Sequence, residues 1–178
     1  MKINDDSFKI TNIHFHVPAE HLIDGKRYDL ELHIYGSTES GKELESAVFF
    51  KEGDENDFIQ DVIDSTENEE SKTFTLSDVY DEGELDNYYY YIGSVSAPFP
   101  DCNENNPWVL LEDVQEASSE QIAYFAEVWA ETATYDNDGR YRNVQPLNGR
   151  KVYLYSEDDD DSSLYLTLSS LLIAFFLI

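Results

Sequence analysis

The chain has 178 residues, and 38 acidic against 11 basic side chains give it a formal net charge of -27. A charge of this sign repels nucleic acid and anionic lipid surfaces, which argues against both as partners. The hydrophobic fraction is 41%, with 13 Tyr and 10 Phe, so we exclude a disordered acidic chain and expect one folded, β-rich domain.

The first predicted strand, residues 8–16, carries two histidines separated by one residue. On a strand this spacing places His14 and His16 on one face and Phe15 on the other. The pair fits a metal site, although a histidine in a strand is more often a surface residue or a hydrogen-bonded core residue. The spacing alone leaves both interpretations open.

A second strand is predicted at residues 28–34, after the hairpin turn signal Asp24-Gly25. Antiparallel pairing with the first strand would bring His33 beside the first two histidines. Three neutral imidazole ligands leave zinc its full charge and one open position for water, as in a catalytic rather than a structural site.

The rest of the chain predicts further short strands and two helices. We expect a central strand at residues 47–50, a short surface helix at 57–63, a packed segment or strand at 73–79 and a polar turn at 81–87. An aromatic strand at 88–93 and a buried strand that begins at 108–111 follow. The predicted domain ends with a helix at 119–131, a polar loop at 135–141 and a closing segment at 144–155. Ser118 and Gln121 predict a capping box at the second helix, with Ile122, Phe125 and Trp129 on its apolar stripe.

The C-terminal end changes character after the predicted domain, residues 1–155. Residues 156–163 form an acidic spacer, and residues 164–178 contain no charge. Fifteen residues fall short of the ~20 that span a bilayer as a helix. A hydrophobic tail of this length suits a GPI-attachment signal, which predicts the secretory pathway or cell surface; a short tail anchor or a helix buried against a partner are the alternatives. The first six residues lack the apolar region of a signal peptide.

Several motifs together resemble the α-class carbonic anhydrases. They are His-Phe-His-Val-Pro-Ala-Glu-His at residues 14–21 with Asp-Leu-Glu-Leu-His at 29–33, Tyr-Tyr-Tyr-Tyr-Ile-Gly-Ser-Val-Ser-Ala-Pro at 88–98, Ser-Ser-Glu-Gln-Ile at 118–122, and Val-Gln-Pro-Leu-Asn-Gly-Arg-Lys-Val at 144–152. The motifs occur in the family's order, and the likeness runs from about Phe8 to Tyr155.

The resemblance implies a mainly β (α+β) fold: a central twisted, mostly antiparallel sheet with a few short surface helices. Compared with the family, the chain lacks the N-terminal portion, so we expect either a fragment or a shortened relative. Missing strands would leave a sheet edge that a partner chain could complete. Cys102 also lacks the N-terminal cysteine with which secreted members commonly pair it, and we expect it to be free, buried or intermolecular.

The same resemblance implies a Zn²⁺ site and assigns roles to residues by their position in the motifs. His21 takes the place of a structural histidine and is not counted as a ligand. The implied metal ligands are His14, His16 and His33; the catalytic residues are Ser96 and Glu20; Glu31 and Asn12 support the ligands; and Tyr35, Glu45, Val95 and Trp108 line the substrate pocket.

The implied reaction is the reversible hydration of CO2 to bicarbonate and a proton, by attack of a hydroxide that zinc generates from water. Two departures from the family pattern support an alternative, a catalytically impaired carbonic-anhydrase-like binding or assembly module. Tyr35 and Glu45 stand where the family has small apolar residues, and a carboxylate is costly to bury there. In addition, all four histidines are already assigned, so none remains to carry the proton away.

Overall fold

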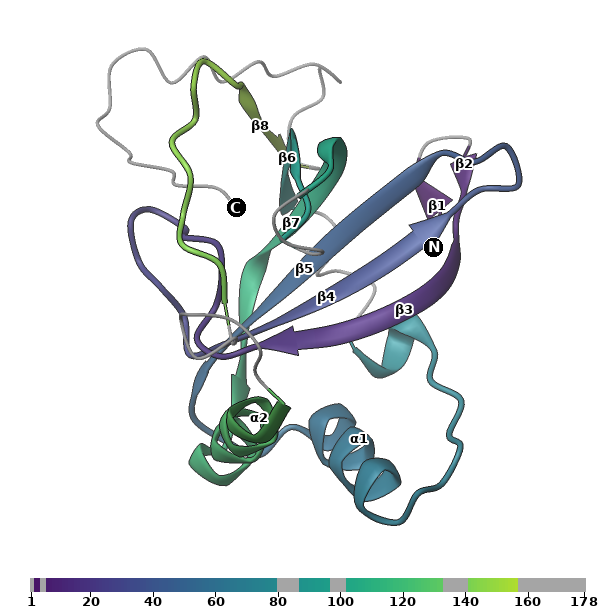
Figure 1. Cartoon of the computed structure of the whole chain (residues 1–178), viewed down its shortest axis with the longest axis vertical. Coiled ribbons are helices and arrows are strands. Elements are labelled where there is room, and N and C mark those ends of the chain that lie inside the picture. The colour runs from purple at the N-terminus through teal and green to yellow at the C-terminus, as the bar shows by residue number, and fades with distance from the viewer. Residues whose placement is uncertain (1, 4–5, 80–86, 97–101, 133–140, 157–178) are drawn as a thin grey trace.

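The computed structural model describes residues 2–3, 6–79, 87–96, 102–132 and 141–156 (Figure 1). Most of the turn expected at residues 81–87 and of the loop expected at 135–141 lies outside these ranges, as do the acidic spacer after Ser156 and the whole hydrophobic tail. Within the described ranges, no helix combines the length and the apolar character needed to cross a membrane.

One six-stranded sheet organises the chain, and it follows the order β3-β4-β5-β7-β6-β8. The only parallel contact between neighbours in this order is that of β5 with β7, which confirms the prediction of a mostly antiparallel sheet. The strands are β3 (Lys9–His16), β4 (Leu30–Ser37), β5 (Glu43–Glu52), β6 (Asn87–Ser94), β7 (Glu104–Ala117) and β8 (Val152–Ser156); a separate two-stranded sheet pairs β1 (Lys2–Ile3) with β2 (Asp6–Ser7).

The turn predicted from Asp24-Gly25 lies between β3 and β4. Both residues have positive φ, 51° and 74°, and the flanking residues Ile23 and Lys26 form an antiparallel bridge. Glycine and aspartate tolerate this conformation better than most residues, so the sequence favours a tight reversal here. Beyond it, β3 and β4 pair in a register that sets His14 opposite His33.

Strand alternation divides the buried side chains between the two faces of the sheet. On one face Phe15, Leu32, Val48 and Val109 belong to a large apolar cluster. On the other face a smaller cluster includes Phe49, Tyr91, Trp108 and Leu110. His14, His16 and His33 lie on this second face, because they alternate with the residues that the first cluster buries.

Two helices cover the first face, α1 (Asp57–Glu67) and α2 (Ser119–Thr132), and lie side by side at one end of the sheet (Figure 1). Phe58, Ile59 and Ile63 of α1 are buried in the large cluster together with Phe125 of α2, whose neighbour on the predicted stripe, Ile122, packs against it. The side chain of Trp129 lies outside the described part of the chain.

The predicted capping box at α2 is confirmed. The backbone N–H of Gln121 donates to Ser118 Oγ over 3.2 Å, and the N–H of Ser118 donates to Gln121 Oε1 over 3.1 Å. The N–H of Asn56, the N-cap of α1, also donates to Gln121 Oε1, over 3.0 Å. This shared amide joins the beginnings of the two helices.

Between α1 and β6 the strand alternative for residues 73–79 is wrong. The segment contains a single 3-10 turn, Leu76–Asp78, in which Asp78 Oδ2 accepts the backbone N–H of Thr75 over 2.6 Å. Packing is the correct alternative, since Val79 is buried and Phe74 lies against the large cluster.

Candidate metal centre

Three imidazole rings meet on the second face of the sheet, two from β3 and one from β4. The ring centroids of His14 and His33 are 5.0 Å apart, those of His14 and His16 5.1 Å, and those of His16 and His33 4.5 Å. One ligand atom from each ring can be chosen so that all three lie within 4.8 Å of one another. This is the spacing at which a single ion can contact all three rings.

In two of these rings, the outer nitrogen, which points away from the other imidazoles, is hydrogen-bonded to a side chain outside the cluster. His33 donates from Nε2 to Glu31 Oε1 over 2.7 Å, and His14 Nδ1 lies 2.8 Å from Asn12 Oδ1. The inner nitrogens, His33 Nδ1 and His14 Nε2, then face each other across 3.2 Å. Two lone pairs at this distance repel unless a positive charge lies between them, so the donor set fits a proton or a metal ion.

Glu31 is the fully buried anchor of the cluster. Besides His33, its carboxylate accepts His21 Nδ1–H over 2.5 Å and the backbone N–H groups of Glu20 and His21 over 2.7 and 2.9 Å. Burial alone would raise the pKa of Glu31, but His21 and His33 outweigh it and hold that pKa well below its usual value. Glu31 is therefore a carboxylate that fixes which nitrogen of His33 faces the cluster.

His21 has a structural position in the same network. It donates to Glu31 from Nδ1, and its Nε2 lies 2.7 Å from the hydroxyl of Tyr91. His21, Glu31 and His33 are also close enough to hold an ion. Because the hydrogen atoms of both imidazoles already point at the carboxylate, we assign this group to ligand support and not to a second metal site.

The pKa values of the two facing histidines move in opposite directions. Burial, with the neighbouring imidazoles His33 and His16, lowers the pKa of His14 to about 3. Burial also acts to lower the pKa of His33, but the carboxylates of Glu31, Glu45 and Glu20 together outweigh it and raise that pKa to about 9. His14 is thus neutral at pH 7, whereas a metal ion bound here would have to displace a proton from His33.

Glu20 lies behind His16 and joins the cluster to two distant loops. Its Oε1 is 3.3 Å from His16 Nδ1 and accepts the backbone N–H of Arg142 over 2.6 Å. Burial raises the pKa of Glu20, and the Glu31 carboxylate adds to the rise; His33, the Arg142 N–H and the Ser96 hydroxyl oppose it. The Ser96 hydroxyl therefore lies within reach of the Glu20 carboxylate.

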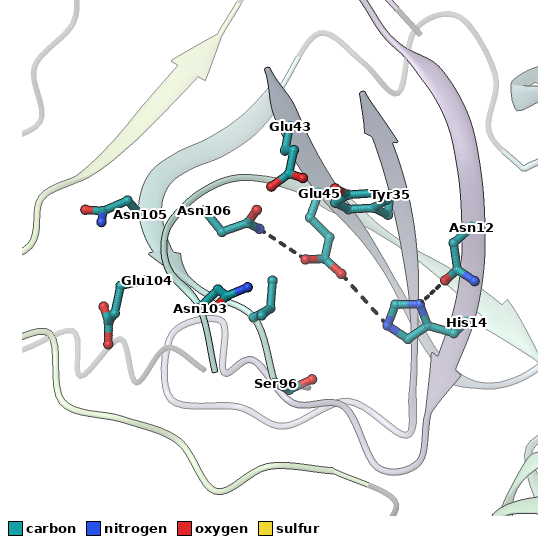
Figure 2. A pocket seen from close by; sticks show the side chains of 11 residues that line it. Asn12, His14, Tyr35, Glu43, Glu45, Ser96, Asn103, Glu104, Asn105 and Asn106 are labelled. Carbon is teal, nitrogen blue, oxygen red and sulfur yellow. Dashed lines mark hydrogen bonds and ion pairs between the residues drawn. The ribbon is translucent and has the colours of Figure 1, made fainter. Parts of the chain in front are cut away.

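A cavity of about 330 Å³ opens beside the cluster (Figure 2). Most of its lining residues are polar in type, with His14 at one side and the chain after β6 at the other. The lining residues are Asn12, His14, Tyr35, Glu43, Glu45, Val95, Ser96, Asn103, Glu104, Asn105 and Asn106. Tyr35, Glu45 and Val95 are thus brought together as pocket residues.

Trp108 does not line this cavity. It is fully buried behind the histidines, with its ring centroid 4.8 Å from that of His33 and 4.8 Å from that of His21, and its Nε1–H donates to the carbonyl of Ser94 over 3.2 Å. The parallel pairing of β5 with β7 sets Trp108 beside Glu45 in the backbone, and its side chain fills the space under the site.

Sequence reasoning overlooked two site residues. Arg142 donates from its backbone to Glu20 and from its guanidinium to Ser94 Oγ, over 3.0 Å, and to the carbonyl of Val95, over 3.3 Å. Asn106 donates to Glu45 over 3.1 Å. Neither lies in a local motif, and Arg142 is 122 residues from Glu20, so no signal in the sequence could have linked them.

Cys102 lies close to the pocket loop. It is buried and free, and its Sγ is 3.7 Å from the carbonyl oxygen of Ser96. Of the three expected states, free and buried describe it here.

Comparison with known proteins identifies the family of the chain. Residues 1–156 match the family model for eukaryotic-type carbonic anhydrase. Alpha carbonic anhydrase 3 of Arabidopsis thaliana is 33% identical over 165 residues, which cover 85% of this chain and 55% of the relative. A carbonic anhydrase of Nostoc sp. is 31% identical, covering 85% and 56%. The chain thus spans about half the length of these relatives.

Solved structures give the same result. The α-carbonic anhydrase of Thermovibrio ammonificans, in complex with the inhibitor sulfanilamide, is 32% identical with a TM-score of 0.68, and the match covers 84% of this chain and 64% of that one. Dioscorin complexed with ascorbate is 25% identical with a TM-score of 0.71, covering 87% and 65%. The resemblance carried by the motifs is confirmed, and the chain belongs to the eukaryotic-type carbonic anhydrase family.

Proposed function

We propose that this chain binds Zn²⁺ through His14, His16 and His33 and catalyses the reversible hydration of CO2 to bicarbonate and a proton. The observation that carries the proposal is the 3.2 Å approach of His14 Nε2 and His33 Nδ1, with the outer nitrogens of both rings held by Asn12 and Glu31. Bound there, zinc would acidify a water molecule and so supply a nucleophile near neutral pH.

The residues around the histidines have separate roles in the proposed reaction. Glu31 holds the His33 ring with Nδ1 toward the cluster. Glu20, buried and near Ser96, would accept a hydrogen bond from the Ser96 hydroxyl, so that the lone pairs of Ser96 Oγ turn to the attacking oxygen and aim it at the carbon of CO2. A C–O bond forms, and the proton leaves through water, since none of the four histidines stands free to carry it.

The test is the chain's zinc content together with CO2 hydration that a sulfonamide inhibits. We expect about one zinc per chain, and loss of both zinc and activity in His33→Ala. Glu39→Gln, on the exposed turn after β4, is the control and should keep both. A chain that folds and binds no zinc would refute the proposal.

A second candidate function is a module that binds the metal without efficient turnover and pairs with another chain. The Glu45 carboxylate in the cavity favours it, since a charge there opposes an apolar substrate. The position of β3 at the end of the strand order favours pairing. Zinc bound at full stoichiometry, with no hydration even in Glu45→Val and Tyr35→Val, would support this function over the first.

A further inference from the structure

Glu45 has an unusual place for a carboxylate. It lies in the middle of the sheet on β5, where its Cα pairs with Tyr35 of β4 and Trp108 of β7, and only 4% of its surface is exposed. Figure 2 shows its side chain between Asn106 and His14, directed at the imidazole. Strands on both sides fix its backbone, so the carboxylate is held there by the sheet and not by a loop.

The distances from Glu45 to two of the histidines are close to those between the ligands of one metal ion. Glu45 Oε1 lies 3.8 Å from His14 Nε2 and 3.7 Å from His33 Nδ1, while these two nitrogens are 3.2 Å apart. Ligands about 2.0–2.2 Å from a tetrahedral zinc are separated by about 3.3–3.6 Å. The three atoms therefore approximate three corners of one coordination tetrahedron, and His16 belongs to the same histidine group as His14 and His33.

The orientation of the carboxylate supports the same interpretation. Asn106, itself buried, donates from Nδ2 to Glu45 Oε2 over 3.1 Å and leaves Oε1 to face the imidazoles. A hydrogen bond to the far oxygen is how a ligating carboxylate is usually held. Within the described residues, the ion-pair contacts of Glu45 are with His14 and His33, and neither a lysine nor an arginine opposes it.

The charge of the site adds a further argument. Glu20, Glu31 and Glu45 are three buried carboxylates around one histidine cluster. Buried carboxylates are costly without a compensating cation, and a divalent ion between Glu45 and the histidines supplies that charge.

We propose that Glu45 is a fourth protein ligand of the metal bound by His14, His16 and His33, occupying the coordination position that hydration requires for water. This inference rests on the proposed zinc site and concerns its regulation. A site closed by its own carboxylate binds metal tightly, and it turns over only to the extent that water displaces Glu45. Removing the carboxylate should open the position.

Cobalt substitution tests this directly, because the visible absorption of Co²⁺ reports its ligands. In the wild-type chain we expect azide to leave the Co²⁺ spectrum unchanged. In Glu45→Val azide should change it, since water now holds the fourth position. The dissociation constant of zinc should rise roughly tenfold or more in the same variant. Glu39→Gln, an exposed carboxylate on the turn between β4 and β5 and outside the cavity lining, is the control and should behave as wild type.

The outcomes separate the two proposals. If azide alters the wild-type spectrum as it alters that of Glu45→Val, Glu45 is no ligand and the inference is overturned, while the three-histidine site stands. If the folded wild-type chain binds neither Co²⁺ nor Zn²⁺, the proposed function fails as well. If Glu45→Val does not fold, the isosteric Glu45→Gln replaces it in the same measurement. A change of its Co²⁺ spectrum on addition of azide would support the proposal, and an unchanged spectrum would oppose it.

Discussion

His33 and Glu31 are two residues apart on β4, and the Nε2–H of one donates to the Oε1 of the other over 2.7 Å with both side chains fully buried. Residues at this spacing share a face of a strand, so the hydrogen bond follows from the strand itself. It fixes Nδ1 of His33 as the nitrogen that faces His14.

The first prediction concerns zinc affinity. Glu31→Gln keeps the shape of the side chain but removes the charge that stabilises the His33 tautomer. We expect the dissociation constant of zinc to rise about 10- to 100-fold, measured by competition with a chromogenic chelator. The exposed Glu39→Gln should bind zinc as wild type does. An unchanged affinity in Glu31→Gln would show that His33 is oriented without this hydrogen bond.

The second prediction concerns stability against pH in the metal-free chain. The pKa of Glu31 is depressed in the folded state, so its stabilisation is complete above the unfolded value of 4.5 and is lost as the pH falls through the folded value. The difference in unfolding free energy between wild type and Glu31→Gln, about 3–5 kcal/mol for a broken buried ion pair, should therefore be largest between the unfolded pKa values of the carboxyl group, 4.5, and the imidazole, 6.5, and should fall as the pH rises through the folded His33 pKa of about 9. It should shrink in acid, as followed by urea denaturation across a pH series.

A difference that stays constant down to the lowest pH at which the chain folds would contradict a depressed pKa. Glu39→Gln is again the control, because its exposed side chain lies on the turn between β4 and β5 and away from the histidines.

The third prediction concerns the hydroxyl of Ser96. Ser96→Ala should lower kcat/KM for CO2 hydration roughly 100-fold, because the attacking oxygen loses its orienting partner. Ser96→Thr should retain the activity that Ser96→Ala loses, since threonine keeps the hydroxyl and its β-branch restricts χ1. Zinc content should not change in either variant. Equal activity in Ser96→Ala and wild type would remove Ser96 from the mechanism.

The fourth prediction concerns the aromatic packing under the site. A Cβ on Gly93 would contact the ring of Tyr91 and lie 3.1 Å from Trp108 Cδ1, in a buried stack that backs His21 and His33. We expect Gly93→Ala to reduce the free energy of unfolding by about 1–3 kcal/mol, measured with urea. Trp108 fluorescence should also change.

Gly53→Ala is the matched control for that overpacking. Its Cβ would lie 2.6 Å from Glu116 Cδ, but that side chain is half-exposed and flexible and can move away. We expect little loss of stability. An equal loss in both variants would mean that the cost comes from backbone conformation and not from the aromatic stack.

Local rules determined much of the site from the sequence. The two-residue period of a strand placed His14 and His16 on one face, and the Asp24-Gly25 turn with antiparallel pairing brought His33 opposite His14. The capping residues likewise predicted where α2 begins. These features depend on neighbouring residues only, so they can be derived from the chain as it is written.

The tertiary structure decided what depends on long-range pairing. The β5–β7 contact placed Trp108 behind the histidines, and the chain leading into β7 brought Asn106 to Glu45; Arg142 reached Glu20 across 122 residues. The sequence, by its family resemblance, put Glu45 in the pocket, but only the folded sheet shows that its Oε1 faces His14 and His33. The reason is physical: strand order and the paths of the loops arise from the packing of the whole core, which no local pattern encodes.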